Sequence, residues 1–277
     1  MIKGGRPPGS PRGGHPLAGL RIVLTRPREQ AGDFIDVVSS LGGQPEIAPA
    51  IAIAPPPNWN EVDAALRQID RHAWVAFTSA NAVRAVAVRA RALGMKPANF
   101  AAVKLAAVGK STADVLAAEL RPPDVTARTA SASALGNDLP VSPGMRVLLP
   151  QADLAGDALG ASLRARGAEL TEVVAYRTVP GEGIPAIVAG WRDETIAALL
   201  FASGSAVTFV AEALDAARTA HGADSAVRPA IFCIGPSTAH AAAMAGLEPS
   251  GVAAAATQQA LIDEMARWFA EHRPGNA

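Results

Sequence analysis

Residues Phe77–Val83 read FTSANAV, and 124 positions further on residues Phe201–Val207 read FASGSAV. In both stretches an apolar run ends at a phenylalanine, a serine follows two positions later, and a helical pattern begins. Serine is a frequent first residue of a helix, and a strand that turns into a helix is the repeating unit of α/β proteins. The two stretches therefore predict an α/β fold with two similar halves.

Two further pairs of segments match in the same order. Ala31–Asp33 is repeated at the same offset by Ala155–Asp157, both reading AGD. Val108–Ala113, VGKSTA, is matched two positions later than that offset by Ile234–Ala239, IGPSTA. Matches in one order at nearly one offset predict an internal duplication.

Short apolar strand candidates alternate with helical patterns along the chain. The strand candidates are Arg21–Leu24, Trp74–Phe77, Lys104–Val108, Arg146–Leu149, Ile196–Phe201 and Ile231–Ile234. This alternation predicts parallel sheets covered by helices, in two α/β domains. Two extended segments, Glu46–Ile53 and Leu170–Thr178, take equivalent places in the two copies and predict a pair of connecting strands. Periodicity alone would divide the chain near residues 140–143.

The charge balance excludes one class of function. Lys and Arg together number 25, as do Asp and Glu, so the chain lacks the basic footprint of a nucleic-acid binder. The single cysteine, Cys233, excludes an internal disulfide and a cysteine-based zinc site, and the five histidines show no metal-ligand spacing. We expect no metal and a reducing compartment.

The first 17 residues predict a disordered tail, because they are rich in Pro and Gly and contain no apolar run. They lack the apolar core of a secretory signal. No segment of the chain has the roughly 20 uncharged apolar residues that a membrane span needs. We therefore expect a cytoplasmic protein with no membrane partner.

One motif suggests a nucleotide site but is incomplete. Gly109–Thr112 reads GKST, like the end of a Walker phosphate-binding loop, but Lys104 stands where that loop has its first glycine. The repeat copy, Gly235–Thr238, reads GPST and has no lysine. Nor does a dinucleotide-binding glycine pattern follow any strand. We expect neither nucleotide hydrolysis nor a dinucleotide cofactor.

Four serines mark the predicted junctions between strands and helices: Ser79, Ser111, Ser203 and Ser237. The simplest interpretation is that each caps its own helix. The alternative is that the free amides of these helix N-termini bind anions, at the sheet edge where open parallel sheets bind ligands. Four such termini would suit a ligand that carries several carboxylates.

In the order and spacing of its motifs, the chain resembles the uroporphyrinogen-III synthase family over roughly residues 18–272. The residues that carry the resemblance are Val23–Pro27, Trp74–Val83, Ala107–Gly109 with Thr112 and Ala113, Val174–Thr178, Phe201 with Ser203 and Val207, and Ile234–Pro236 with Thr238 and Ala239. The chain departs from the family at Ala202, where members often have threonine.

The resemblance implies a cofactor-free cyclising hydro-lyase of porphyrin and heme biosynthesis. Members convert hydroxymethylbilane into uroporphyrinogen III, with loss of water and inversion of ring D. Their fold is two α/β domains joined by a two-stranded connector, with the active site in the cleft between the domains. Carried over to this chain, residues 18–45 and 179–272 form one domain, residues 53–169 the other, and residues 46–52 and 170–178 the connector. We expect a monomer.

The resemblance also implies roles for individual side chains. Tyr176 matches the family tyrosine and is expected to act as a general acid on the departing hydroxyl, unless it only packs with its own hydroxyl in water. Thr112 and Thr238 match the family's cleft threonines, and Arg26 and Lys110 are expected to pair with carboxylates. The expected substrate-binding residues are Arg26, Thr78, Ser79, Lys110, Ser111, Thr112, Ser203, Ser205, Ser237 and Thr238.

Two questions stay open at this point. A non-catalytic cytoplasmic module that binds a tetrapyrrole or a small anion would share the same fold and donors. A handover of hydroxymethylbilane from the preceding pathway enzyme is also left open. The small-molecule substrate is the expected partner, and no nucleic-acid or membrane partner is expected.

Overall fold

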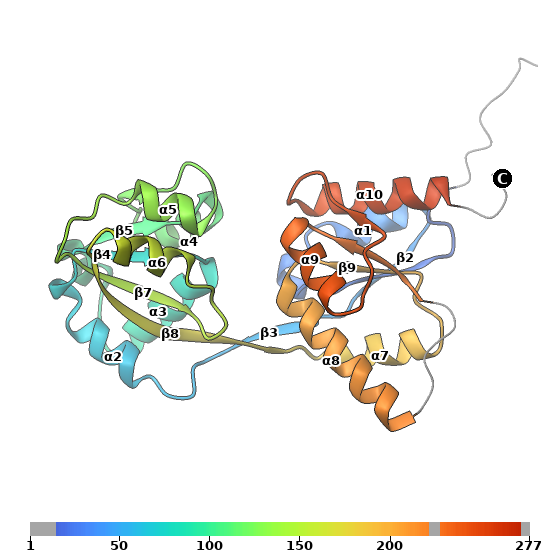
Figure 1. Ribbon diagram of the computed structural model, residues 1–277, viewed down its shortest axis with the longest axis horizontal. Helices are drawn as coiled ribbons and strands as arrows, with labels where there is room; N and C mark the ends of the chain where they lie inside the picture. Colours follow the sequence, from blue (N-terminus) through green and yellow to red (C-terminus); the bar gives the residue numbers. More distant parts are fainter. Residues whose placement is uncertain (1–14, 222–227, 273–277) are drawn as a thin grey trace, which may run out of the picture. The chain divides into compact units, whose positions relative to one another are not determined.

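The computed structural model describes residues 15–221 and 228–272 of the chain, and these form two compact units (Figure 1). Unit 1 contains the residues up to Ala52 and those from Pro180 onward, and unit 2 contains Ile53–Val179. The chain leaves unit 1 within β3 (Ile51–Ala54) and returns to it within β8 (Glu169–Pro180), and these strands are hydrogen-bonded neighbours. Residues 140–143, where periodicity alone would divide the chain, lie inside unit 2.

A six-stranded sheet forms the centre of unit 2, in the order β3-β8-β7-β4-β5-β6. From β8 to β6 all neighbouring strands are parallel. The strands not yet given are β4 (Trp74–Phe77), β5 (Lys104–Ala107), β6 (Val125–Thr126) and β7 (Arg146–Ala152). The central strand β4 is buried along its whole length, as its apolar run predicts.

Side-chain alternation along these strands divides the core of unit 2 between two faces. Val75 and Phe77 pack with α2 (Asn60–Arg67), α3 (Ala80–Ala92) and α4 (Lys110–Glu119). Trp74 and Ala76 point the other way. They pack with α5 (Ala132–Asp138) and α6 (Ala158–Ala165). The unit also contains the short 3-10 helices η2 (Ile69–Arg71) and η3 (Pro97–Ala102).

Unit 1 is built on a five-stranded, all-parallel sheet in the order β11-β10-β9-β1-β2. Its strands are β1 (Arg21–Leu24), β2 (Gln44–Ile47), β9 (Ala198–Phe201), β10 (Ala230–Cys233) and β11 (Gly251–Val252). All six strand candidates of the sequence coincide with a strand of one of the two sheets to within two residues at the start and three at the end.

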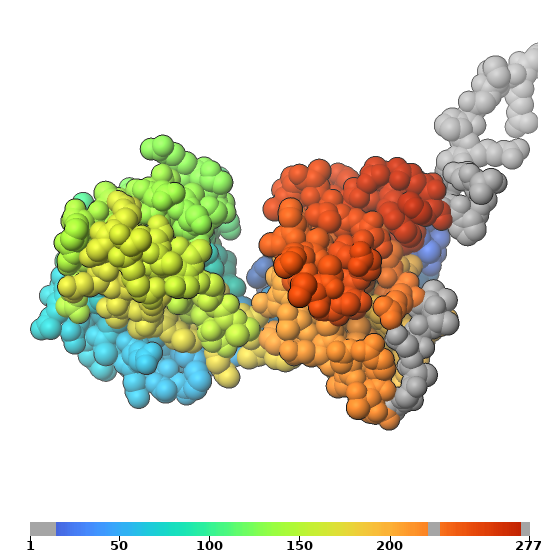
Figure 2. All heavy atoms as spheres, in the orientation of Figure 1, coloured from blue at the N-terminus to red at the C-terminus, as the bar shows by residue number. Residues whose placement is uncertain are grey.

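Helices cover both faces of this second sheet. The helices α1 (Phe34–Ser40) and α10 (Gln258–Glu271) pack on Ile22 and Leu24. The helices α7 (Ile184–Arg192), α8 (Gly204–His221) and α9 (Pro236–Met244) pack on the other face, and η1 (Arg28–Gln30) follows β1. In Figure 2, α8 and α10 form much of the visible surface of this unit, in orange and red.

Two expected boundaries differ from those in the structure. Residues 1–14 of the expected tail lie outside the described residues, but Leu17 is fully buried and its amide donates to the Leu41 carbonyl oxygen. This part of the tail prediction was wrong, because Leu17 completes the core beneath α1. In addition, Glu46 and Ile47 belong to β2, which pairs with β1, so the strand beside β8 begins only at Ile51.

Candidate active site

The carboxyl edge of the unit 2 sheet brings two helix N-termini together. Strands β4 and β5 are parallel neighbours, so the helices that follow them, α3 and α4, begin side by side. Ser79 caps α3, and its Oγ accepts a hydrogen bond from the amide of Ala82 at 3.1 Å. Thr78, directly before this cap, is half-buried. The capping role expected for Ser79 is confirmed.

Tyr176 lies at the same edge. Its hydroxyl is 3.1 Å from Ser79 Oγ, and either group can donate to the other. Only 8% of Tyr176 is exposed, and its ring packs in the core of unit 2. The alternative that its hydroxyl is bound only to water is therefore wrong, since Ser79 is its partner.

A bulge in β8 determines where Tyr176 points. Gln151 of β7 is paired with Val174, but the next residue, Ala152, is paired with Tyr176, so Ala175 is an additional residue in β8. Regular alternation would place Tyr176 on the opposite face from Val173 and Ala175. With the bulge, all three side chains lie on the α3 face of the sheet.

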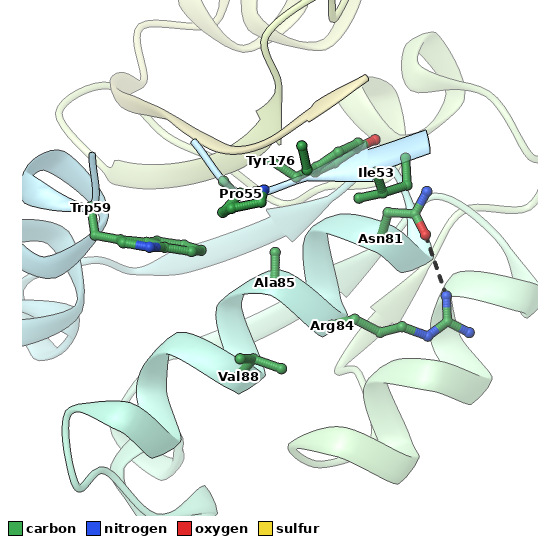
Figure 3. Close-up of a pocket in the computed structure, with 10 residues that line it drawn as sticks. Ile53, Pro55, Trp59, Asn81, Arg84, Ala85, Val88 and Tyr176 are labelled. Carbon is green, nitrogen blue, oxygen red and sulfur yellow. Dashed lines mark hydrogen bonds between the residues drawn. The ribbon is translucent and has the colours of Figure 1, made fainter. Parts of the chain in front are cut away.

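A pocket of about 310 Å³ opens beside Tyr176, between α3 and the strands β3 and β8 (Figure 3). Its lining is mostly apolar: Ile53, Ala54, Pro55, Trp59, Ala85, Val88, Ala175 and Tyr176, with Asn81 and Arg84 as the polar members. Arg84 Nη1 donates to Asn81 Oδ1 at 3.4 Å. All of these residues belong to unit 2.

The N-terminus of α4 differs from the expected serine cap. Gly109 is the N-cap, and a side chain there would come within 2.9 Å of the Ala130 Cβ. Ser111 is the second residue of the helix and is exposed, so the capping interpretation was wrong for Ser111. The first intrahelical bond runs from the Ala113 amide to the Gly109 carbonyl oxygen. The amides of residues 110–112 precede this bond and are available to a ligand.

The side chains of this turn are not equivalent. Thr112 is buried, with 5% exposed. The Lys110 side chain is 87% exposed, and its Nζ lies 2.9 Å from the Asp114 carboxylate one turn along the helix. The structure therefore places Lys110 in an exposed ion pair within α4. We keep its role as a carboxylate partner only as a proposal.

The carboxyl edge of the unit 1 sheet has a comparable arrangement. Thr25, at the end of β1, donates through Oγ1 to the Leu200 carbonyl oxygen of β9 at 2.9 Å. Ser203 Oγ accepts from the Ala206 amide at 3.3 Å, which confirms its capping role. Arg26 and Ser203 line one pocket of about 120 Å³, together with Gln30.

Arg26 has no carboxylate partner among the described residues. Its Nε donates to Gln30 Oε1 at 3.3 Å, and burial lowers the pKa of its guanidinium. A half-buried cation without an acid favours binding of an anion from outside the chain. The expected role of Arg26 as a carboxylate partner stays a prediction.

The remaining expected residues lie on the two helices that follow β9 and β10. Ser205 is half-buried in the first turn of α8. Gly235 is the N-cap of α9, so the capping interpretation was wrong for Ser237, which is exposed. Thr238 is buried, with 4% exposed. The starts of α4 and α9 thus agree in detail: a glycine precedes each helix, and a buried threonine follows.

Two other kinds of reactive group, a thiol nucleophile and a metal centre, find no support among the described residues. Burial raises the pKa of the Cys233 thiol to about 11, which makes it a poor nucleophile at neutral pH. Within residues 15–221 and 228–272, no group of three or more His, Cys, Asp or Glu side chains is arranged to hold a metal. In the same ranges no helix is long and apolar enough to cross a membrane.

Sequence reasoning missed most residues of these pockets, among them Trp59, Arg84 and Gln30. Gln30 lies four positions after Arg26, a spacing typical of a contact within one helical turn. Arg84 lies on one helical face with Asn81 and Val88, which interrupts the apolar pattern of α3. Trp59 has no such signal, since its place depends on the packing of α2 against α3.

Comparison with known proteins identifies the fold. Over 91% of the chain and the whole of its counterpart, the structure is similar to a mutant uroporphyrinogen III synthase of Thermus thermophilus, with a TM-score of 0.65 and 22% identity. Uroporphyrinogen-III synthetase of Helicobacter pylori matches 88% of the chain and 97% of its own length, with a TM-score of 0.56 and 16% identity. At these identities the similarity shows a shared fold.

Comparison of sequences shows the family. A curated relative, the porphyrin biosynthesis protein HemD of Ruminiclostridium josui, is 28% identical over 165 residues, which are 59% of this chain. The match spans only 33% of that relative's length. The family model described as "Uroporphyrinogen-III synthase HemD" matches residues 33–263, most of the chain. The chain therefore belongs to the uroporphyrinogen-III synthase family, whose members are cyclising lyases of tetrapyrrole biosynthesis.

Proposed function

We propose that this chain converts hydroxymethylbilane into uroporphyrinogen III, with loss of one water and inversion of ring D. The observation that carries the proposal is the hydroxyl pair of Tyr176 and Ser79, 3.1 Å apart at the carboxyl edge of a parallel sheet. Open α/β sheets bind their ligands at this edge. Membership of the family supplies the reaction class.

In this proposal individual groups at the site recognise the substrate, and a large basic surface is not needed. The substrate carries eight carboxylates, whereas the chain has a net charge of zero and no excess of basic residues. Free amides at the N-termini of α4 and α9 are suited to bind carboxylates, helped by the helix dipoles. Arg26 adds a cation that lacks an acid partner among the described residues. A weak dependence of KM on salt is the expected consequence.

Tyr176 acts in the first step as a hydrogen-bond donor. The C–O bond of the hydroxymethyl group breaks as the pyrrole nitrogen supplies the electron pair and loses its N–H proton, and the departing oxygen gains a proton and leaves as water. The phenol donates a hydrogen bond to this oxygen, while Ser79 holds the phenol in place. A phenol is a weak acid at neutral pH, so its contribution is at the lower end of general acid catalysis, about 10²-fold.

Orientation of the linear tetrapyrrole contributes the rest of the rate enhancement. The azafulvene that results is reactive enough to cyclise unaided, and without an enzyme it gives the uninverted type I isomer. Ring D therefore has to be held so that its substituted carbon attacks, through a spiro intermediate. Control of proximity and orientation can supply several kcal/mol without a strong acid or base. Deletion of a single side chain is then not expected to abolish turnover.

The experiment is direct. Hydroxymethylbilane is added to the purified chain, the products are oxidised, and the uroporphyrin isomers are separated. We expect type III in excess over type I, at a rate above the spontaneous one. Type I alone, formed at the spontaneous rate, would contradict the proposal and favour a non-catalytic tetrapyrrole-binding module.

A further inference from the structure

The pocket beside Tyr176 differs in chemistry from the sheet edge that it adjoins. The edge presents hydroxyls and amides, whereas the pocket is lined mainly by apolar side chains. Ile53 and Val88, both on its wall, are 41% and 56% exposed. Large apolar side chains left in water at one concave site indicate a ligand that covers them.

The aromatic wall of this pocket is supported by residues that do not line the pocket. Trp59 lies beneath the Arg89 guanidinium, whose Cζ is 5.3 Å from the ring centroid. Arg89 in turn donates through two nitrogens to the buried Asp63 carboxylate, each at 2.6 Å. Pro55 and the Tyr176 ring complete a set of flat surfaces (Figure 3). Such surfaces suit a planar ring more than an aliphatic chain.

One cation of α3 is left without an acid, and it lies at this pocket. Arg89 is paired with Asp63, and Arg91 is paired with Glu119 at 2.9 Å. Arg84 has no carboxylate partner among the described residues and contacts only the Asn81 amide oxygen, at 3.4 Å. Its guanidinium lies at the rim in Figure 3. The position suits a carboxylate carried by a ring that enters the pocket.

We propose that this pocket binds one pyrrole ring of the substrate, with a carboxylate arm of that ring on Arg84. The proposal rests on the proposed function. The volume of about 310 Å³ is at the lower end of the range for ligand sites, roughly 300–1,000 Å³, so it holds one substituted ring and excludes a whole tetrapyrrole. A ring bound here contacts the ring of Tyr176, so the pocket acts as a positioning site for the reaction.

The first test removes the cation and compares two arginines of the same helix. Arg84→Gln is expected to raise KM for hydroxymethylbilane about tenfold, the effect of losing one charge-assisted hydrogen bond, with a smaller change in kcat. Arg91→Gln removes the same charge from α3 outside the pocket and is expected to leave KM unchanged. Equal KM values for wild type and Arg84→Gln would overturn the proposal.

The second test fills the pocket. Ala85→Phe places a ring on the pocket wall, whereas Ala92→Phe places one on an exposed position of the same helix that does not line the pocket. We expect Ala85→Phe to raise KM and to increase the share of the type I isomer. No change in either quantity, with the variant folded as judged by circular dichroism, would overturn the proposal.

The third test observes binding without turnover. The probe is a single pyrrole that carries one acetate and one propionate arm, and the signal is tryptophan fluorescence. We expect a saturable change in wild type, its loss in Trp59→Phe, and weaker binding, by about tenfold, in Arg84→Gln. A change that persists in Trp59→Phe, or no saturable change in wild type, would count against a pyrrole site here.

These outcomes separate the two proposals. If wild type forms only type I, the proposed function fails, whatever the pyrrole probe does. If wild type forms type III but Arg84→Gln, Ala85→Phe and the probe show no effect, the function stands and the pocket assignment is wrong.

Discussion

The Tyr176 hydroxyl lies 3.1 Å from the Ser79 hydroxyl, although the two residues are 97 positions apart in the chain. Ser79 uses the same oxygen to cap α3. One serine thus stabilises the start of a helix and fixes the position of a phenol. Since both contacts lie within unit 2, a single substitution can disturb the helix, the phenol or both.

Tyr176→Phe removes the phenol and keeps the ring. We expect kcat to fall by about 10- to 100-fold, because a weak acid contributes modestly and orientation supplies the rest. The ratio of type III to type I product should fall less than the rate. Steady-state kinetics with isomer separation gives both quantities. A loss of more than about 10⁴-fold would show that the phenol, and not orientation, dominates.

Ser79→Ala and Ser203→Ala form a matched pair, since each serine caps a helix after a central strand. Each substitution is expected to lower the free energy of unfolding by about 1 kcal/mol through loss of the cap. Only Ser79 also holds Tyr176, so Ser79→Ala should lower kcat in addition. Urea unfolding and kinetics on both variants measure the two effects, and an equal kcat for the two would refute the link to Tyr176.

Arg26→Gln tests the unpaired cation of unit 1. We expect KM to rise about tenfold, because a charge-assisted bond to a carboxylate is lost. The free energy of unfolding should stay the same or rise, since a half-buried charge without an acid partner among the described residues is removed. Arg28→Gln, an exposed neighbour outside the pocket, is the control. A loss of stability with unchanged KM would indicate a structural role.

His72 predicts a pH dependence of stability. Burial lowers its pKa below the usual value of about 6.5, against the opposing effect of the Gln68 carbonyl. The folded state therefore resists a proton that the unfolded chain accepts. The free energy of unfolding should be constant above about pH 6.5 and decrease as the pH falls below it, by at most about 1.4 kcal/mol per unit.

The measurement is urea unfolding at pH 7.5, 6.5 and 5.5 for wild type and two variants. His72→Gln should flatten the pH dependence, although it also removes the contact of Nε2 with Thr171 Oγ1 at 3.1 Å. His240→Gln, at an exposed position, should leave the wild-type slope intact. An unchanged slope in His72→Gln would assign the dependence to other groups.

The sequence predicts most strands because each is a short apolar run buried on both faces of a sheet. It predicts caps less well. Ser79 and Ser203 cap their helices, but Ser111 and Ser237 do not, since Gly109 and Gly235 already occupy the N-cap position in extended conformation. Both kinds of junction contain a serine near a helix start, and only the backbone distinguishes them. The internal duplication stays a prediction from the matched segments.

The pocket beside Tyr176 was beyond prediction for a different reason. Trp59 directly precedes α2 and Arg84 lies in α3, and these helices meet only through tertiary packing. The Asp63–Arg89 pair that supports Trp59 joins residues 26 positions apart. Periodicity assigns a residue to a face of its own element. It does not show which faces of separate elements enclose a space.

The additional residue in β8 determines on which face of the sheet the phenol lies. Every side chain after Ala175 is shifted by one position relative to β7, so no substitution at Tyr176 reproduces or cancels its orientation. If the bulge were lost without a change in chain length, so that Ala175 took the place opposite Ala152, regular alternation would turn the phenol toward the α6 side of the sheet. Strand register thus governs the site as strictly as residue identity does, and substitutions at Tyr176 alone leave this determinant unsampled.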